Sequence, residues 1–302
     1  MITKRTYLRL LMGLLCAATS VHAQQSRKLK PTSKIYVADM VGDAEINLGT
    51  EIDELTKRSV YNAEGTSITT KANSNASLVF SNGTGIYFDA STLVQIKQFN
   101  QDSFRPNRAD IDDEPSISTT HIFVSHGDIG ISTSKLVAGS TLVVDTSLAS
   151  ASIRGRQSVV HVKDNLTVIS MVQGEATVKA GLLDPSHLVP EGKQIIIRPG
   201  KTDEQNIVVI QNISDGKSDD ERIWLDDRLV TADSSRRVVY FEVQNRTGAA
   251  AAAVGGGVTA FDGGSNAAGG TDSGGNQIIA VPVTPATPPV QPNVSPANLS
   301  GQ

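Results

Sequence analysis

Arg154, Gly155 and Arg156 follow a predicted strand, and we assign the candidate binding site to these three residues. A guanidinium donates N–H groups in a fixed fork, so two arginines this close could hold a carboxylate or a sulfate. The alternative is a tight turn with solvated arginines. The sequence favours the turn, because ion pairs at a surface contribute little. Both interpretations stay open at this point.

A cluster of acids offers the hard oxygen ligands that calcium prefers. Its members are Asp110, Asp112, Asp113 and Glu114. The cluster lacks the fixed spacing and the glycine of a calcium-binding loop. We therefore predict that Asn100 to Ser118 form a solvated loop, inserted between two strands.

Zinc is not expected either. Removal of a predicted export signal takes away Cys16, the only cysteine, and leaves four histidines: His121, His126, His161 and His187. None of them forms a close pair with another zinc-type ligand. His161 lies between two valines, at a strand position that is expected to face solvent. The sequence predicts no metal site and no cofactor.

The sequence also lacks the arrangements that catalysis requires. Serines are frequent from Ser147 to Ser158, but no Gly-x-Ser-x-Gly motif or activating base accompanies them. Gly83 and Gly85 lie in a predicted hairpin and not ahead of a helix, so they do not form a phosphate-binding loop. We therefore predict a protein that is not an enzyme.

Aromatic side chains have two open interpretations. They could line a face that binds glycans, or they could be core residues, which is the more usual role of aromatic residues in strands. The residues in question are Phe80, Tyr87, Phe88, Phe123 and Trp224.

The elements that position these residues are predicted strands, which the sequence marks as alternating apolar runs separated by turn residues. Asn82 and Gly83 separate two alternating apolar runs, Ala76–Phe80 and Gly85–Phe88. An Asn-Gly pair in this setting predicts a hairpin, in which both turn residues are expected to adopt positive φ. Further alternating runs recur up to about Pro199, and several are rich in β-branched residues.

We predict an all-β fold, an antiparallel sandwich or roll of many short strands, with a short helical C-terminal segment and a disordered tail. The other predicted strands are Ala44–Asn47, Ser67–Thr70, Leu93–Gln98, His121–Ser125, Gly130–Thr133, Ser140–Asp145, Ala151–Arg154, Ser158–Val162, Thr167–Met171, Ala176–Lys179 and Gln194–Arg198. Ile207–Ile210 could be a last strand, and acids at 219–221 indicate the start of a helix. Arg236–Asn245 could be a strand or a second helix.

Five regions follow from these patterns. Residues 1–23 have the basic start, the short apolar core and the small residues before a cleavage site that characterise a signal peptide. Residues 24–36 read as a flexible lead-in, 37–199 as the β-domain, 200–246 as a strand and helix extension, and 247–302 as a tail rich in Ala, Gly and Pro. Cleavage after Ala23 predicts a periplasmic or secreted protein. A lipoprotein anchor at Cys16 is the less favoured alternative.

Charge narrows the range of partners. The chain carries a net charge of −4, and loss of Lys4, Arg5 and Arg9 with the leader makes it −7. An acidic surface disfavours nucleic acid and anionic lipid. No later segment is apolar enough to insert into a membrane. The oligomeric state is not indicated.

Residues from about Val37 to Arg198 resemble the FecR family of extracytoplasmic domains. The matching blocks, in the family order, are Ile68–Thr70 with Ser77–Phe80, Asn82-Gly83 and Ile86–Phe88; Ser125–Ile129; Leu142–Thr146 with Ala151–Gly155; and Thr167–Val178. Arg156 replaces the threonine of the usual Arg-Gly-Thr step, and Ser147 replaces a frequent proline. These departures concern the candidate site more than the fold.

The resemblance implies a function outside the cytoplasm. The best-known members of the family are regulators with a cytoplasmic anti-sigma segment and one membrane helix, and we expect this chain to represent the partner-sensing half alone. We predict a non-catalytic binding or scaffold module that contacts an envelope protein, with signal sensing as one role that such a contact could serve. The alternative is a module that binds extracellular polysaccharide.

Overall fold

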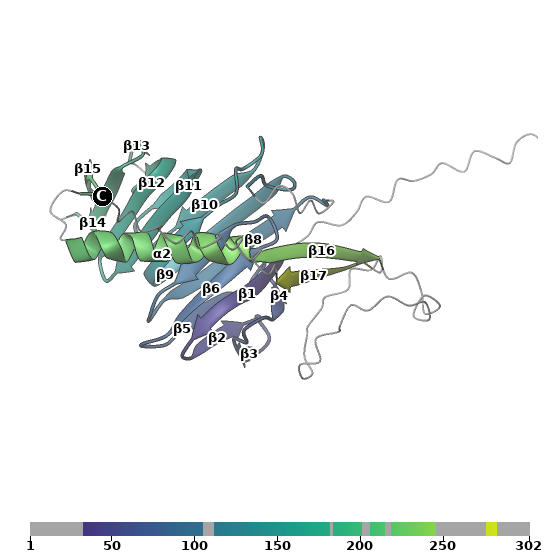
Figure 1. Ribbon diagram of the computed structural model, residues 1–302. Coiled ribbons are helices and arrows are strands. Elements are labelled where there is room, and N and C mark those ends of the chain that lie inside the picture. Colours follow the sequence, from purple (N-terminus) through teal and green to yellow (C-terminus); the bar gives the residue numbers. More distant parts are fainter. Residues whose placement is uncertain are drawn as a thin grey trace, which may run out of the picture. The chain divides into compact units, whose positions relative to one another are not determined.

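The structure of the protein is a computed structural model that describes residues 33–104, 112–181, 184–200, 206–214, 219–245 and 276–282. Figure 1 shows these residues as a broad folded sheet, with one helix lying across it. The predicted leader with Cys16, its cleavage site after Ala23, and Asp110 of the acidic cluster lie outside the described residues.

Strands dominate the described part of the chain, which confirms the predicted all-β fold with a helical segment. They are β1 (Lys34–Val41), β2 (Ala44–Asn47), β3 (Ile52–Glu54), β4 (Val60–Asn62), β5 (Ser67–Thr70), β6 (Asn75–Phe80), β7 (Gly85–Phe88), β8 (Leu93–Gln101), β9 (Ser118–Ser132), β10 (Thr141–Asp145), β11 (Ser150–Lys163), β12 (Leu166–Lys179), β13 (His187–Val189), β14 (Lys193–Pro199), β15 (Asn206–Asn212), β16 (Val239–Asn245) and β17 (Asn276–Pro282). The helix is α2 (Asp219–Arg237).

Fifteen of the described strands belong to one sheet, whose main path runs β15-β14-β12-β11-β10-β9-β7-β6-β1-β4. Strands β8, β5, β2 and β3 continue from β9 as a branch. The strand pairs are antiparallel except β9 with β10, which is parallel. The sheet begins at Lys34 and ends at Asn212, so it extends beyond the predicted limits of 37 and 199. Ile35 and Tyr36, placed in the lead-in by the sequence, are buried in it.

Three long strands allow the sheet to fold over itself. The first part of β9 pairs with β8 and β10, and its second part pairs with β7 and β11. The change occurs at Gly127, which has a φ of +96°. Strands β11 and β12 are each irregular in the middle as well, at Gly155 and Gly174. The sequence predicts two short strands at each of these places, because a glycine interrupts the alternation where one strand bends.

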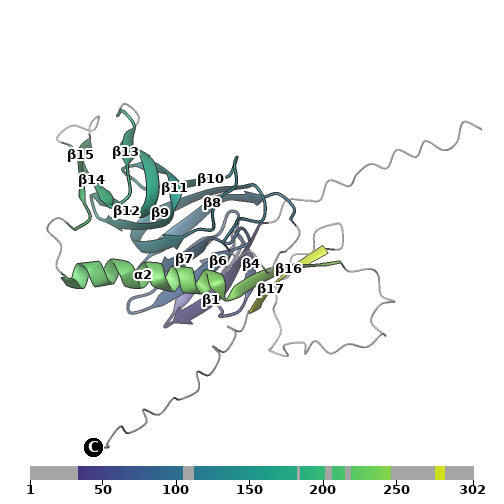
Figure 2. The same ribbon diagram turned by 45° about the horizontal axis from the view of Figure 1, so that its top comes forward.

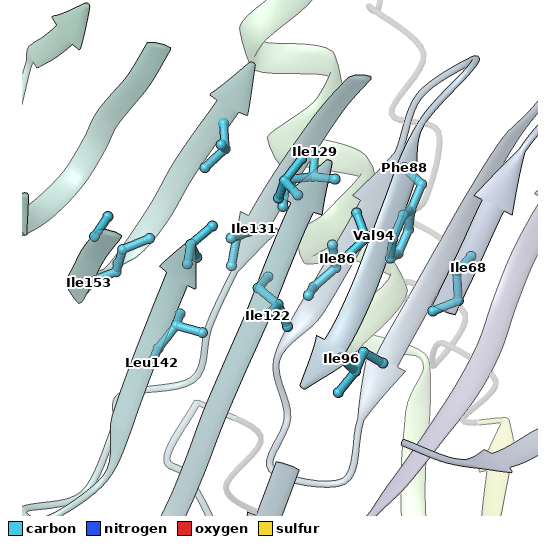
Figure 3. Packing of buried hydrophobic residues seen from close by; sticks show 14 of the residues in the cluster. Ile68, Ile86, Phe88, Val94, Ile96, Ile122, Ile129, Ile131, Leu142 and Ile153 are labelled. Atoms are coloured by element: carbon cyan, nitrogen blue, oxygen red, sulfur yellow. The ribbon is translucent and has the colours of Figure 1, made fainter. Parts of the chain in front are cut away.

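The folded sheet encloses one apolar core. Figure 3 shows isoleucines, a valine, a leucine and a phenylalanine from β5, β7, β8, β9, β10 and β11 pointing into it. Labelled members are Ile68, Ile86, Phe88, Val94, Ile96, Ile122, Ile129, Ile131, Leu142 and Ile153, each no more than 2% exposed. Burial of this apolar surface is the main favourable contribution to folding in a domain whose described residues contain no cysteine.

The hairpin between β6 and β7 forms where the Asn-Gly signal predicts it, with a different turn. The Gly83 N–H donates to the Phe80 carbonyl, and the Phe80 N–H donates to the Thr84 carbonyl. Gly83 has a φ of +86°, whereas Asn82 keeps a negative φ. This is the three-residue loop in which only the last residue is left-handed. Asn82 is buried, and its side-chain oxygen accepts from the Thr84 N–H at 3.0 Å.

Helix α2 covers the outer face of the sheet. It begins at Asp219, as the acids at 219–221 predict, and Figures 1 and 2 show it running across β9, β7 and β6. Leu225 and Leu229 pack on Val159 of β11. A Cβ atom added at Gly85 would lie 2.3 Å from the Ala232 carbonyl oxygen, and one at Gly130 would lie 3.0 Å from the Arg228 Cβ. The two glycines therefore let the helix backbone approach the sheet closely.

The segment after α2, for which the sequence allowed a strand or a second helix, forms a strand. Arg236 and Arg237 end the helix, and Val239–Asn245 form β16, which pairs with β17. Strand β17 lies in the region for which the sequence predicts a disordered tail, and this part of that prediction is wrong. The high Ala, Gly and Pro content of the whole region conceals the run Gln277–Val281, in which Ile278, Ile279 and Val281 are β-branched and suit a strand.

We predict that Gly85→Ala displaces α2. The methyl group would collide with the helix backbone, and overpacking of this kind costs about 1–3 kcal/mol of unfolding free energy. Urea unfolding measures this loss, and the emission of Trp224, the only tryptophan, reports the helix position. In Gly49→Ala the new methyl meets no atom within 4 Å, and only a φ of +89° opposes it. A Gly85→Ala protein with unchanged Trp224 emission would contradict the predicted displacement.

Candidate functional site

The candidate residues Arg154, Gly155 and Arg156 lie inside strand β11 and not in a tight turn. Gly155 pairs with Gly174 of β12, and the register shifts between Gly155 and Gln157. A Cβ atom at Gly155 would lie 2.4 Å from the Gln173 carbonyl oxygen, and one at Gly174 would lie 2.2 Å from the Gly155 Cα. The two glycines let the strands touch at a bulge, which removes the turn interpretation.

The bulge separates the two arginines. Arg154 is exposed and lies opposite Glu175 in the strand register. Arg156 instead donates from Nη2 to Asp112 Oδ1 at 3.0 Å. The arginines therefore do not form one fork together, but Arg156 does hold a carboxylate, which belongs to the chain itself.

Two further arginines reach the same carboxylate. Arg236 Nη1 lies 3.5 Å and Arg237 Nη2 lies 3.6 Å from Asp112 Oδ1. We call Arg156, Arg236, Arg237 and Asp112 the arginine junction. It joins β11, the end of α2 and the segment before β9. The side chain of Asp112 is 56% exposed, so the junction opens to solvent.

Asp233 orients the two arginines of the helix. It accepts from Arg236 at 3.2 Å and from Arg237 Nε at 2.6 Å, and Ser132 of β9 donates to it at 2.9 Å. Three guanidiniums thus face two carboxylates, and the surplus charge of the cluster is positive. Sequence reasoning missed Arg236 and Arg237 here, because it assigned Arg236 to the start of the next element and not to the end of the helix that begins at the acids 219–221.

Arg236 anchors the helix end to the β6–β7 hairpin. Its side chain is buried, and it donates from Nε to the Gly83 carbonyl and from Nη2 to Ser134 Oγ, both at 3.0 Å. Burial lowers the pKa of this guanidinium, while the charge of Asp233 acts in the opposite direction. A buried arginine with partners on both sides fixes where α2 ends.

Glu114 corrects the prediction of a solvated loop. Only 4% of this residue is exposed. One carboxylate oxygen accepts from Ser118 Oγ at 2.5 Å and from Asn82 Nδ2 at 3.4 Å; the other accepts from Ser140 Oγ at 2.6 Å and from the Val137 N–H at 2.9 Å. The low apolar content of the segment suggested solvation, but here hydrogen bonds satisfy a buried acid.

Glu114 also fixes the position of Asp112. The Lys135 N–H donates to the Asp112 carbonyl at 2.7 Å, and the Glu114 N–H donates to the Lys135 carbonyl at 3.1 Å. Asp112 therefore lies at the junction because its backbone is held between a buried acid and the segment after β9. In addition, the predicted loop is shorter than expected, since Gln101 belongs to β8 and Ser118 begins β9.

A second charged contact holds the middle of α2. The guanidinium of Arg228 lies 3.7 Å from the ring centroid of Trp224 and pairs with Asp89. Burial lowers the pKa of Arg228 to about 10. Stacking on an aromatic ring and an ion pair together stabilise a desolvated arginine.

His161 is not the freely exposed residue that strand alternation predicts. It does point outward from the sheet, but α2 covers that face. Its ring lies 6.5 Å from that of Trp224, and Nδ1 contacts Asp128 Oδ1. The side chain is 31% exposed. Its exposure was overestimated because the covering helix is distant in sequence.

His121, His161 and His187 each contact an acid, and the histidines do not gather as ligands. His121 contacts Asp145, and His187 contacts Asp184. Within the described ranges, no three His, Cys, Asp or Glu residues form a group that could hold a metal ion. Asp145 accepts hydrogen bonds from both Ser150 and His121. A hydrolytic triad instead places the imidazole between the serine and the acid.

The aromatic residues divide between core and interface. Phe80 and Phe88 are fully buried, as the core interpretation predicts. Tyr87 and Trp224 lie beside Arg228 at the helix, and Lys97 lies over the ring of Phe123 at 4.7 Å. None of these five rings is an exposed platform of the kind that stacks on sugars.

Comparisons with known proteins leave the family open. No family model matches the chain, and no curated protein matches it. Two crystal structures of a protein from Parabacteroides distasonis ATCC 8503, provisionally named an anti-sigma factor, are similar to it. They are 13% and 15% identical, with a TM-score of 0.36 for each, and the match covers 48% of this chain and 59% of theirs.

This chain therefore spans less than two thirds of the length of those structures. A likeness this distant carries no argument about activity, so the FecR resemblance stays a prediction. Among the described residues, no helix combines the length and apolar composition that crossing a bilayer needs.

Glu114→Ala should disorder the segment before β9. It leaves two hydroxyls and a backbone N–H without their acceptor, and such losses cost about 2–4 kcal/mol of unfolding free energy. Asp113→Ala is the matched control, because the neighbouring Asp113 is exposed and its removal should cost less than about 0.5 kcal/mol. Urea unfolding of both variants measures the difference, and equal stabilities would show that the buried acid is dispensable.

Acid should loosen the end of α2. Burial raises the pKa of Asp233, but hydrogen bonds from Arg237 and Ser132 and the charge of Arg236 outweigh it and bring the pKa below 3.8. A lowered carboxyl pKa stabilises the fold above the unfolded-state pKa, and this stability is lost as the pH falls through the folded-state value.

We therefore expect Trp224 emission and urea stability to change as the pH falls below about 4. Asp233→Asn should be less stable than the wild type at neutral pH and should show a smaller acid-dependent loss. If both proteins lost stability in parallel, Asp233 would not be the responsible group.

Proposed function

We propose that this protein is a non-catalytic binding module of the cell envelope, which holds an acidic segment of another protein at the arginine junction. In this proposal the leader is cleaved after Ala23 and the module acts in the periplasm or outside the cell. The FecR resemblance of residues 37–198 and the signal-peptide pattern support this location, and the proposed partner is an envelope protein.

The observation that carries the proposal is the convergence of three guanidiniums on one exposed carboxylate. Arg156, Arg236 and Arg237 all lie within 3.6 Å of Asp112 Oδ1. Their arrangement binds a carboxylate with N–H donors from two elements, which is the geometry that acidic side chains of a partner require. Asp112 occupies this place within the free chain, and a partner carboxylate would replace it.

Two features make such an exchange feasible. The side chain of Arg237 is 50% exposed and that of Arg156 is 38% exposed, so a partner can approach both. Arg236 is buried and held by Gly83 and Ser134, so the site keeps its shape when Asp112 leaves. Preorganised donors reduce the entropy lost on binding.

Cross-linking in intact cells, followed by fractionation and recovery of the protein with its partners, tests the proposal. Arg156→Ala should lower the recovery of the partner roughly tenfold, because it removes a charge-assisted hydrogen bond. Arg154→Ala is the matched control, since Arg154 belongs to the same motif but is not among the arginines that contact Asp112. Asp112→Ala should raise recovery, because it removes the competing carboxylate.

The same experiment checks the location. The recovered protein should start at Gln24 and come from the periplasmic or extracellular fraction. Equal recovery with Arg154→Ala and Arg156→Ala, or a protein retained in the cytoplasm, would refute the proposal. Unchanged Trp224 emission in each variant ensures that the fold is retained.

A further inference from the structure

Helix α2 packs outside the main apolar core. No residue of α2 whose burial the structure describes belongs to that core, whose buried members all precede the helix in the sequence. The helix contacts the sheet through a small separate cluster, in which Leu225 and Leu229 meet Val159 of β11. Val239, which follows the helix, belongs to a third cluster with Tyr36. Opening of the helix would therefore leave the main core enclosed.

Polar contacts hold α2 at three places along its length. They are the ion pair of Arg228 with Asp89, the hydrogen bond from Ser132 to Asp233, and the hydrogen bond from Arg236 to the Gly83 carbonyl. Residues 228 and 236 lie about 12 Å apart along the helix axis. An α-helix is stiff over this distance, so we expect its contacts with the sheet to form and break together.

The arginine junction has parts on both sides of this contact. Arg236 and Arg237 belong to α2, whereas Arg156 belongs to β11 and Asp112 to the segment before β9. Asp112 Oδ1 lies 3.0 Å from Arg156 Nη2 and within 3.6 Å of both helix arginines. If α2 opens, Asp233 stays with those two arginines because it lies on the same helix, but Asp112 loses them. A carboxylate at the place of Asp112 therefore favours the closed position of α2.

We propose that α2 opens from the sheet as one unit, and that a carboxylate in the arginine junction holds it closed. In the free chain this carboxylate is Asp112. An acidic segment of a partner takes over the same role, and this part of the inference rests on the proposed function. A ligand that binds only the closed form lowers the open population in proportion to its free concentration relative to its Kd. Because linkage is reciprocal, any protein that captures the opened helix weakens the binding of the partner.

Backbone hydrogen exchange of the full-length protein, measured by NMR, tests the inference. We expect Asp112→Ala to speed exchange about three- to fivefold along the whole of α2, from Leu225 to Arg236, because a charge-assisted contact is lost at a partly exposed site. Ile131 of the main core should keep its wild-type rate. Asp113→Ala removes the exposed neighbouring carboxylate and is the matched control, which should leave the exchange of α2 unchanged.

A change at the other contact of the helix tests whether α2 opens as one unit. Asp89→Asn leaves the largely buried Arg228 without its counter-charge. We expect it to speed exchange by about tenfold or more, and equally at Leu225 and at Arg236, which lies about 12 Å beyond the altered contact. An Asp112→Ala effect confined to the last turn, an Asp89→Asn effect that does not reach Arg236, or core amides that exchange faster together with the helix would each overturn the inference.

An acidic peptide separates the inference from the proposed function. In Asp112→Ala, hexaglutamate at about ten times its Kd, as measured by calorimetry, should slow the exchange of α2 about elevenfold. Adding Arg156→Ala to the same chain should remove this effect, because it removes a donor of the junction. A peptide that binds without slowing the exchange would overturn the inference. Absence of binding would count against the proposed function, whereas the exchange rates of Asp112→Ala and Asp89→Asn would still decide whether the junction holds α2 closed.

Discussion

The contact between Gly155 and Gly174 is the constraint on which most of this structure depends. The two backbones approach so closely that no side chain fits at either position. This contact places a bulge in the middle of β11, opposite a residue of β12 with positive φ, and there the long strands pass from one half of the folded sheet to the other. The enclosed core exists because the sheet can bend at such points.

The same bulge also determines which residues the two arginines of the motif contact at the surface. It turns Arg156 toward Asp112 and leaves Arg154 opposite Glu175, so two neighbouring residues of one motif have different partners. Asp112 is in turn held in place by the buried Glu114, whose hydrogen bonds come from four different side chains and backbone groups. A polar network that is fully satisfied restricts its members to one arrangement. The exposed junction is therefore supported by buried groups.

The position of helix α2 on the sheet depends on hydrogen bonds and ion pairs as much as on apolar packing. Leu225 and Leu229 supply the apolar contact, while Arg228 and Arg236 connect the helix to Asp89 and to the Gly83 turn. Glycines at 85 and 130 allow the helix to lie directly on the strands. The helix covers one face of the sheet and leaves the arginine junction at its end exposed to solvent.

Local features of the sequence were enough to indicate many of the strands, the position of the β6–β7 hairpin and the start of α2, but not β1, β3, β4, β13 or β17. Alternation, Asn-Gly chemistry and helix-terminal acids act over a few residues, so they can be read without knowing the fold. The Arg154–Arg156 motif was also recognisable as a group that could hold a carboxylate. Its partner was not, because Asp112 lies 44 residues away in the sequence.

Only the tertiary structure decided which polar residues are buried. Glu114 belongs to a segment with little apolar content, and His161 occupies an outward strand position, yet the β6–β7 hairpin encloses the first and α2 covers the second. Burial depends on elements that arrive from distant parts of the chain, and neither a two-residue nor a 3.6-residue period contains that information.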